Sequence, residues 1–298
     1  MRILAGVAFF VSSLVFSCLA PGAAWPHDAV AAMPDPDDGK LEGDVYVSRY
    51  FGLSYPLPPG WGPDLAGPEP SHRGYYVLGT FAAGEGVRAM MLIAAQDTFF
   101  APAPFRDGAV TVREVRDAMA AIDGQEIDLP PSATTIAGLP FHRVDYSGFG
   151  LWRSTLVTAI RCHLVSFNIT AASAELRAAA VSSLDRLGRL DPPQGGDPAC
   201  KPDQALPDHI VTRIDPPASE PYNPPIPVRL VIDARGAVKH VHVIRATATQ
   251  RAAITAALQR WRLRPPALDG ATALETGVLI QFTPGGVNYL PGDRAPPG

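Results

Sequence analysis

The sequence is poor in cysteine, in basic charge and in long apolar segments. Its 298 residues include 3 cysteines, and 25 lysines and arginines stand against 29 aspartates and glutamates, for a formal net charge of −4. A surface that binds nucleic acid needs a basic excess that releases counterions from the phosphates, so this balance disfavours such binding. After the apolar run Ile3 to Ala20, no segment is both long and apolar enough to span a membrane, which takes about 20 residues.

The sequence also lacks the motifs that carry phosphate binding and acyl transfer. It contains no Gly-Lys-Ser/Thr loop, no Gly-x-Gly-x-x-Gly after a strand and no Gly-x-Ser-x-Gly elbow. His142, Asp145 and Ser154 suggest a Ser-His-Asp set, but nearness in sequence does not make a triad. His240 and His242 share one face of a predicted strand, yet spacing indicates no third metal ligand. We therefore predict no catalytic residue, no cofactor and no metal site, and hence no enzyme.

The N-terminus has the pattern of an export signal. Arg2 precedes the apolar run, and Gly22-Ala23-Ala24 supplies the small residues that a signal peptidase requires. We predict a signal peptide over residues 1–24 and a flexible leader over residues 25–43. The protein is thus expected in the periplasm or outside the cell.

Two alternatives for this segment stay open. Val15-Phe16-Ser17-Cys18 is similar to a lipobox, which would place a lipid on Cys18. The run could also remain uncut as a membrane anchor. Contact with the membrane is expected only through one of these two routes.

The other two cysteines are candidates for a disulfide. In an oxidising compartment Cys162 and Cys200 can pair, and the bond would tie the start of a linker back to the first domain. Two unpaired thiols, with Cys162 buried in a strand, are the alternative.

Residues 44–190 have the pattern of an α+β domain. Alternating or apolar strands and two one-sided helices are predicted in this order: Tyr46 to Leu57, Tyr75 to Phe81, Val87 to Ala95, a helix Val112 to Ile122, Ala133 to Tyr146, Leu151 to Ile160, Cys162 to Ala171 and a helix Ser173 to Leu187. The hydroxyl of Ser173 is suited to cap the second helix.

Three pieces of this domain resemble the PsbP-like family. They are Tyr50 to Trp61, the hairpin Arg153 to Ile169 and the end of the second helix, Leu184 to Leu190. The resemblance covers most of residues 44–190 and implies a small α/β/α sandwich. It also implies a non-enzymatic assembly or binding module of an exported protein.

A second small domain is predicted over residues 225–285, after a proline-rich linker at 191–224 that favours an extended spacer. Its elements are two alternating strands, a helix and a last strand: Val228 to Asp233, Val238 to Arg245, Thr249 to Trp261 and Ala273 to Phe282. Gly236 falls where a hairpin turn needs a positive φ. Trp261 and Pro265 are expected to close the core, and residues 286–298 are expected to form a disordered tail.

This module resembles the C-terminal domain of the TonB family over residues 225–283. The resemblance is carried by Ile232-Asp233, Gly236, the run Trp261-Arg262-Leu263-Arg264-Pro265 and Gly270. It implies a ββαβ fold that docks a peptide by adding it as a strand to an exposed sheet edge. We predict that Thr272 to Phe282 forms this edge. The candidate partner-binding residues are Thr272, Leu274, Thr276, Val278, Ile280 and Phe282.

The chain departs from TonB in two ways. A whole domain stands between the apolar run and the proline-rich spacer, and Ser13 is followed four residues later by Ser17 where an energy-coupling anchor has histidine. We therefore predict an exported, non-enzymatic envelope protein that docks an envelope partner by strand addition. TonB-type energy coupling for transport across the outer membrane is one alternative. A secreted ligand-binding protein or hydrolase that uses the first domain is the other.

Overall fold

The structure is a computed structural model that describes residues 33–84, 86, 88–190, 198–200, 206–217 and 224–292. The predicted signal, the candidate lipid site Cys18 and residues 293–298 lie outside the described residues. From Pro34 onward the described residues form one compact unit. No helix in the described part of the chain is long and apolar enough to cross a membrane. The structure is α+β, as the sequence predicts.

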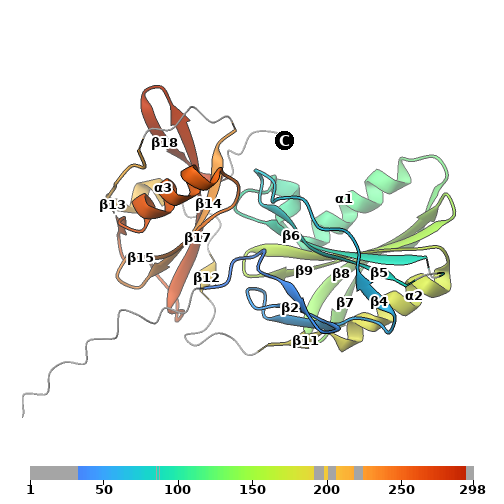
Figure 1. Ribbon diagram of the computed structural model, residues 1–298. Coiled ribbons are helices and arrows are strands. Elements are labelled where there is room, and N and C mark those ends of the chain that lie inside the picture. The colour runs from blue at the N-terminus through green and yellow to red at the C-terminus, as the bar shows by residue number, and fades with distance from the viewer. Residues whose placement is uncertain are drawn as a thin grey trace, which may run out of the picture. The chain divides into compact units, whose positions relative to one another are not determined.

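The N-terminal module, residues 40–190, is built on a seven-stranded antiparallel sheet (Figure 1). Its strands, in spatial order, are β4 (Trp61–Pro63), β5 (Tyr75–Ala83), β6 (Ala89–Asp97), β10 (His163–Ala171), β9 (Leu151–Ile160), β8 (Leu139–Gly148) and β7 (Gln125–Ile136). A second sheet has the order β1 (Lys40–Glu42), β2 (Val45–Ser48), β3 (Leu53–Pro56) and β11 (Gly188–Arg189). The predicted leader thus ends in a strand.

Helices cover both faces of the seven-stranded sheet (Figure 1). Helix α1 (Gly108–Ala120) packs against β7, β8 and β9, and helix α2 (Ala174–Ser183) packs on the opposite face. The alternation of β10 serves both layers, because Leu164 joins the apolar cluster under α1 while Phe167 joins the larger core with α2. Short 3-10 helices are η1 (Ala103–Arg106), η2 (Leu184–Arg186) and η3 (Leu206–His209).

Capping residues set where these helices begin. The hydroxyl of Ser173 accepts a hydrogen bond from the Leu176 N–H, which confirms the predicted cap of α2. Helix α1 begins four residues before the predicted start, because Asp107 caps it by accepting from the Val110 N–H at 2.8 Å.

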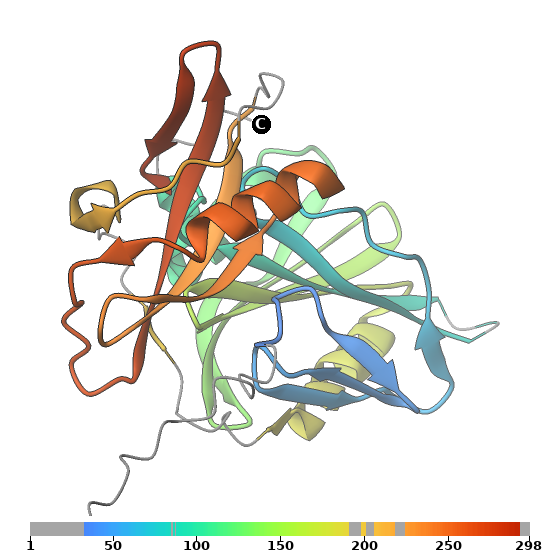
Figure 2. The same cartoon turned by 60° about the vertical axis from the view of Figure 1, so that its left-hand side comes forward.

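The C-terminal module, residues 226–290, has a sheet in which β12 (Ala199–Cys200), β17 (Ala273–Thr283), β14 (Ile226–Asp233) and β15 (Val238–Val243) are neighbours in this order. Strand β18 (Gly286–Leu290) also pairs with β17, although the sequence suggested a disordered tail from residue 286. Helix α3 (Ala248–Leu258) lies across one face of this sheet (Figure 2). Strands β13 (Ile210–Thr212) and β16 (Arg262–Leu263) form a separate pair.

The sequence predictions for single residues of this module are confirmed at Gly236 and Trp261 but not at Pro265. Gly236 has φ +80°, as its hairpin turn requires, and an added Cβ would collide with the Leu263 carbonyl. Trp261 is fully buried in the core and donates its indole N–H to the Ile214 carbonyl at 2.9 Å. Pro265, however, is exposed and does not close the core.

The other face of the C-terminal sheet packs on the N-terminal module through buried charges. Arg229 on β14 places Nη1 2.6 Å from Asp97 Oδ2 and Nη2 3.0 Å from Glu275 Oε2. Glu275 also receives Arg161 Nη2 at 3.1 Å and the Tyr50 hydroxyl at 2.9 Å. Two guanidinium groups thus balance two carboxylates. Because almost none of this cluster reaches water, it joins the modules only while every charge keeps its partner.

The protonation states of this cluster follow from its burial. Burial opposes the charge of Arg229, but Asp97 and the other acidic groups raise the pKa of this guanidinium well above its ordinary value. Burial, and then the charge of Arg229, hold the pKa of His163 well below its ordinary value. His163 is therefore neutral, with its Nδ1 2.8 Å from the Arg161 carbonyl oxygen.

Candidate partner-binding groove

The predicted free edge does not lie on β17. One side of this strand pairs with β14 from Ile226 to Asp233. The other side pairs with β12 at Leu274 and Glu275 and with β18 from Leu279 to Thr283. Of the candidate partner-binding residues, all but Thr272 are buried: Leu274, Thr276, Val278, Ile280 and Phe282. The expectation of an edge at Thr272 to Phe282 failed because two short strands, taken from the predicted linker and tail, pair there.

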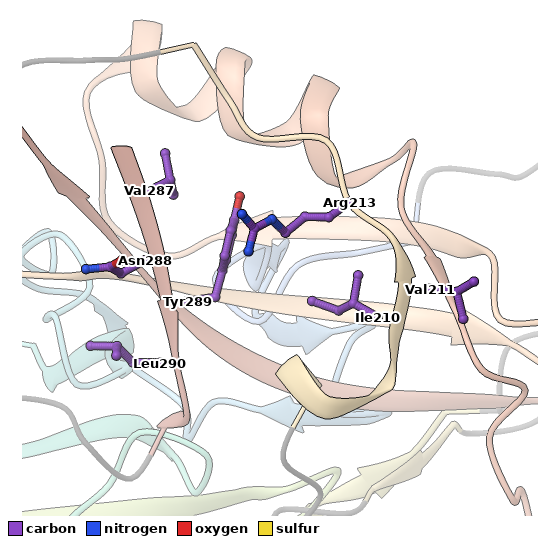
Figure 3. Close-up of a pocket in the computed structure, with 7 residues that line it drawn as sticks. All are labelled: Ile210, Val211, Arg213, Val287, Asn288, Tyr289 and Leu290. Carbon is purple, nitrogen blue, oxygen red and sulfur yellow. The ribbon is translucent and has the colours of Figure 1, made fainter. Parts of the chain in front are cut away.

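An open edge is found instead on β18. Among the described residues, β18 pairs with β17 alone. A groove of about 550 Å³ runs beside it, with β13 and the residues after it on the opposite side. Its lining is Ile210, Val211, Arg213, Val287, Asn288, Tyr289 and Leu290 (Figure 3). An extended chain lying in this groove would meet the backbone donors and acceptors that β18 does not use for β17.

A cluster of polar side chains connects the two walls of the groove. Figure 3 shows the Arg213 and Tyr289 side chains pointing toward one another, and the Arg213 guanidinium lies 5.3 Å from the Tyr289 ring centre. The Tyr289 hydroxyl donates to Asp215 Oδ1 at 3.0 Å, and Arg213 Nε lies 2.9 Å from the same oxygen. Burial, and then the bond to Asp215, raise the pKa of Tyr289, so it remains a protonated donor.

A buried aromatic residue supports the base of the groove. The Tyr289 ring packs edge-on against Trp261 with ring centres 4.8 Å apart, and Trp261 is fully buried. Val211 on the other wall is 66% exposed. The site therefore combines a free backbone edge, an aromatic platform and an exposed apolar rim, which are features of sites that dock peptides.

The sequence did not predict this groove, because a short strand or turn was expected at His209 to Ile214 within the linker but no strand was expected in the tail that forms the other wall. Ile210 to Ile214 lies within the predicted linker, and Val287 to Leu290 lies within the predicted tail. The available signals were the apolar residues Ile210, Val211 and Ile214 between proline-rich stretches and the aromatic Tyr289 after Gly286. Neither run is long enough to show a strand by periodicity alone.

The suspected Ser-His-Asp set is not brought together. His142 lies under α1, where a Cβ added to Gly108 would come within 3.1 Å of its ring. Asp145 of β8 faces the opposite helix layer, where Arg177 of α2 lies 3.9 Å from its carboxylate. Ser154 of β9 is the cross-strand neighbour of Asp145 and faces the same way. The histidine and the other two side chains therefore lie on opposite faces of one sheet.

His240 and His242 meet a carboxylate that their spacing did not reveal. Asp35 Oδ1 lies 2.7 Å from His240 Nε2 and 3.0 Å from His242 Nδ1. Burial would raise the pKa of Asp35, but the bonds to both imidazoles outweigh it and hold this pKa well below its usual range. These contacts attach Asp35, in the described part of the leader, to β15. No group able to hold a metal was found within the described ranges.

The structure pairs Cys162 with Cys200 in a disulfide, with their Cα atoms 5.8 Å apart. Cys162 follows β9 in the N-terminal module, and Cys200 lies on β12 beside Glu275 of β17. The bond therefore fixes the short strand that covers one side of β17.

Comparisons with known proteins give likenesses to part of the chain. No family model matches it, and no curated protein sequence does. The structure is similar to that of cyanobacterial PsbP (CyanoP) from Synechocystis sp. PCC 6803, with 14% identity and a TM-score of 0.34, over 51% of this chain and 98% of that one. It is also similar to LpqN, involved in cell envelope biogenesis of Mycobacterium tuberculosis, with 15% identity and a TM-score of 0.32, over 47% of this chain and 83% of that one.

Proposed function

We propose that this protein is an exported, non-enzymatic envelope protein that docks an extended segment of a partner against strand β18. The observation that carries the proposal is the unpaired edge of β18 along a groove of about 550 Å³. A partner segment that adds as a strand there gains main-chain hydrogen bonds, while Val211 and Tyr289 contact its side chains.

The resemblance to the TonB family supports the same mode of binding. The strand, strand, helix, strand order of β14, β15, α3 and β17 agrees with the order that the resemblance implies. The additional hairpin partner β18 moves the available edge one strand outward from β17. The export pattern at residues 1–24 supports a partner in the envelope.

Site-specific photo-crosslinking in cells tests the proposal. A photoreactive residue at Val211, on the groove rim, is expected to crosslink to one envelope protein. The same residue at Phe149 is a matched control, because Phe149 is 70% exposed on a turn of the N-terminal module. Identical products at both positions would overturn the proposal.

Proline substitutions then test the strand pairing itself. Successive N–H groups of a strand point to opposite sides, so Val287→Pro and Asn288→Pro remove one donor toward β17 and one toward the groove. The variant that keeps the melting temperature of the wild type is expected to lose the Val211 crosslink. If that variant crosslinks as the wild type does, the partner does not add to β18.

A further inference from the structure

A second cavity lies in the N-terminal module, between the seven-stranded sheet and the segment η1–α1. Its volume is about 400 Å³. Helix α1 packs mainly against β7, β8 and β9, and the cavity lies on the same face of the sheet, over β5, β6, β10 and β9. A volume of this size is in the range of about 300–1,000 Å³ typical of small-molecule sites, and is small for a folded partner.

The mouth and the inner wall of the cavity are apolar. Tyr75 and Phe105 stand at the mouth and are 38% and 39% exposed. Val157 and Leu164 are buried beneath them and belong to the apolar cluster under α1. Two large rings left in partial contact with water beside a buried apolar wall would be covered by a ligand with an apolar body.

The floor of the cavity carries a directed chain of hydrogen bonds. Thr155 donates its hydroxyl to Asn168 Oδ1 at 3.1 Å, and Asn168 Nδ2 donates to Ser166 Oγ at 3.0 Å. Each group donates in the same direction, which leaves the Ser166 hydroxyl hydrogen at the end of the chain. Hydrogen bonds that run in one direction polarise one another, so Ser166 is a strengthened donor. No described residue that lines the cavity is an aspartate or glutamate.

We propose that this cavity binds a small amphipathic molecule whose apolar body lies between Phe105 and Leu164. Its polar end is a carbonyl or carboxylate oxygen that accepts the Ser166 hydroxyl hydrogen. Such an oxygen meets a donor there and no acidic side chain, whereas an amine at this position would meet no carboxylate. The site is separate from the β18 groove and does not depend on it.

Binding of the fluorescent probe 8-anilinonaphthalene-1-sulfonate to the full-length folded protein tests the proposal. The probe has an aromatic body and anionic oxygens, so it is expected to bind saturably with one molecule per chain. Ser166→Ala is expected to weaken this binding about tenfold, as the loss of a hydrogen bond to a charged group predicts. Val115→Trp, which fills the cavity from α1, is expected to abolish it.

Val211→Asp in the β18 groove is the matched control and is expected to leave probe binding unchanged. Equal affinity for the probe in wild type and folded Val115→Trp would overturn the proposal, and so would loss of binding in Val211→Asp. If Val115→Trp does not fold, the amide shifts of wild-type protein titrated with octanoate decide. Shifts centred on Ser166 and Asn168 support the site, and shifts elsewhere, or none, overturn it.

Discussion

The two faces of the C-terminal sheet differ in chemistry, because the face against the N-terminal module adds buried charges to apolar contacts such as that of Leu279. On the face under α3, Val228, Leu230 and Ile232 of β14 pack with Trp261 in an apolar core. On the other face, Arg229 of the same strand enters a cluster of buried charges that belongs to both modules. Alternate residues of one strand therefore serve an apolar core and an ionic interface.

The two faces therefore have different roles, one in the stability of the module and one in fixing its position. An apolar core tolerates many arrangements of similar volume, whereas a buried ion pair is stable only in the geometry that satisfies each charge. The apolar face is expected to make the C-terminal module fold, and the charged face is expected to fix its position on the N-terminal module. The β18 groove is then expected to keep a fixed position relative to the N-terminal module.

Removal of Arg229 is expected to have the largest effect on this comparison. Arg229→Ala leaves Asp97 and Glu275 buried with one fewer partner, so the free energy of unfolding should fall by about 3–5 kcal/mol. Urea denaturation monitored by circular dichroism measures it.

The control for this prediction removes the charges together. Arg229→Met combined with Asp97→Asn removes one buried cation and one buried anion and leaves Glu275 paired with Arg161, so it should destabilise less than Arg229→Ala alone. A double variant that is less stable than the single variant would show that packing of the Arg229 side chain, and not its charge, joins the modules.

The disulfide on the charged side is expected to contribute somewhat less. Cys162→Ser with Cys200→Ser opens a loop with a sequence separation of 38 residues. The free energy of unfolding should fall by about 2–4 kcal/mol, mainly because the unfolded chain gains freedom. Reduction of the wild-type protein should reproduce the loss. Unchanged stability after reduction would mean that the charged interface holds β12 without the bond.

His163 makes the charged face sensitive to acid. Its pKa is lowered in the folded protein, so its contribution to stability is complete above the ordinary pKa of about 6.5 and is lost as pH falls below it. The free energy of unfolding should decline by up to about 1.4 kcal/mol per pH unit between pH 6.5 and 5. In His163→Gln the slope of the free energy of unfolding against pH should be smaller, because one fewer proton is taken up on unfolding. An equal slope in both proteins would assign the acid sensitivity to another group.

How much of the molecule the sequence predicts depends on how local the cause is. Ser173 caps its helix and Gly236 takes a positive φ because the reasons lie within four residues of each. Trp261 is buried as its place after an amphipathic helix predicts. Each of these signals needs no knowledge of the rest of the chain.

The groove and the interface have causes that are distant in sequence. Arg229 is an ordinary polar position of an alternating strand until Asp97, 132 residues away, lies against it. The edge of β17 is covered because Ala199 pairs with Leu274 and Tyr289 with Ile280, and neither pairing has a periodic signal. Asp35 likewise meets His240 across 205 residues. Pairings of this kind decide which edge is free, so a strand pattern alone did not place the site.

The smallest expected effect lies on the apolar face, at the start of α3. Thr247 and Gln250 form a capping box, in which the Thr247 hydroxyl accepts from the Gln250 N–H and Gln250 Oε1 accepts from the Thr247 N–H. Thr247→Ala should lower the free energy of unfolding by about 1 kcal/mol and leave its pH slope unchanged, since no ionisable partner is lost. Thr247→Ser, which keeps the hydroxyl, should recover most of the loss. If Thr247→Ala instead altered the acid sensitivity that His163 gives, the two faces would be coupled through the sheet and could not be treated as independent layers.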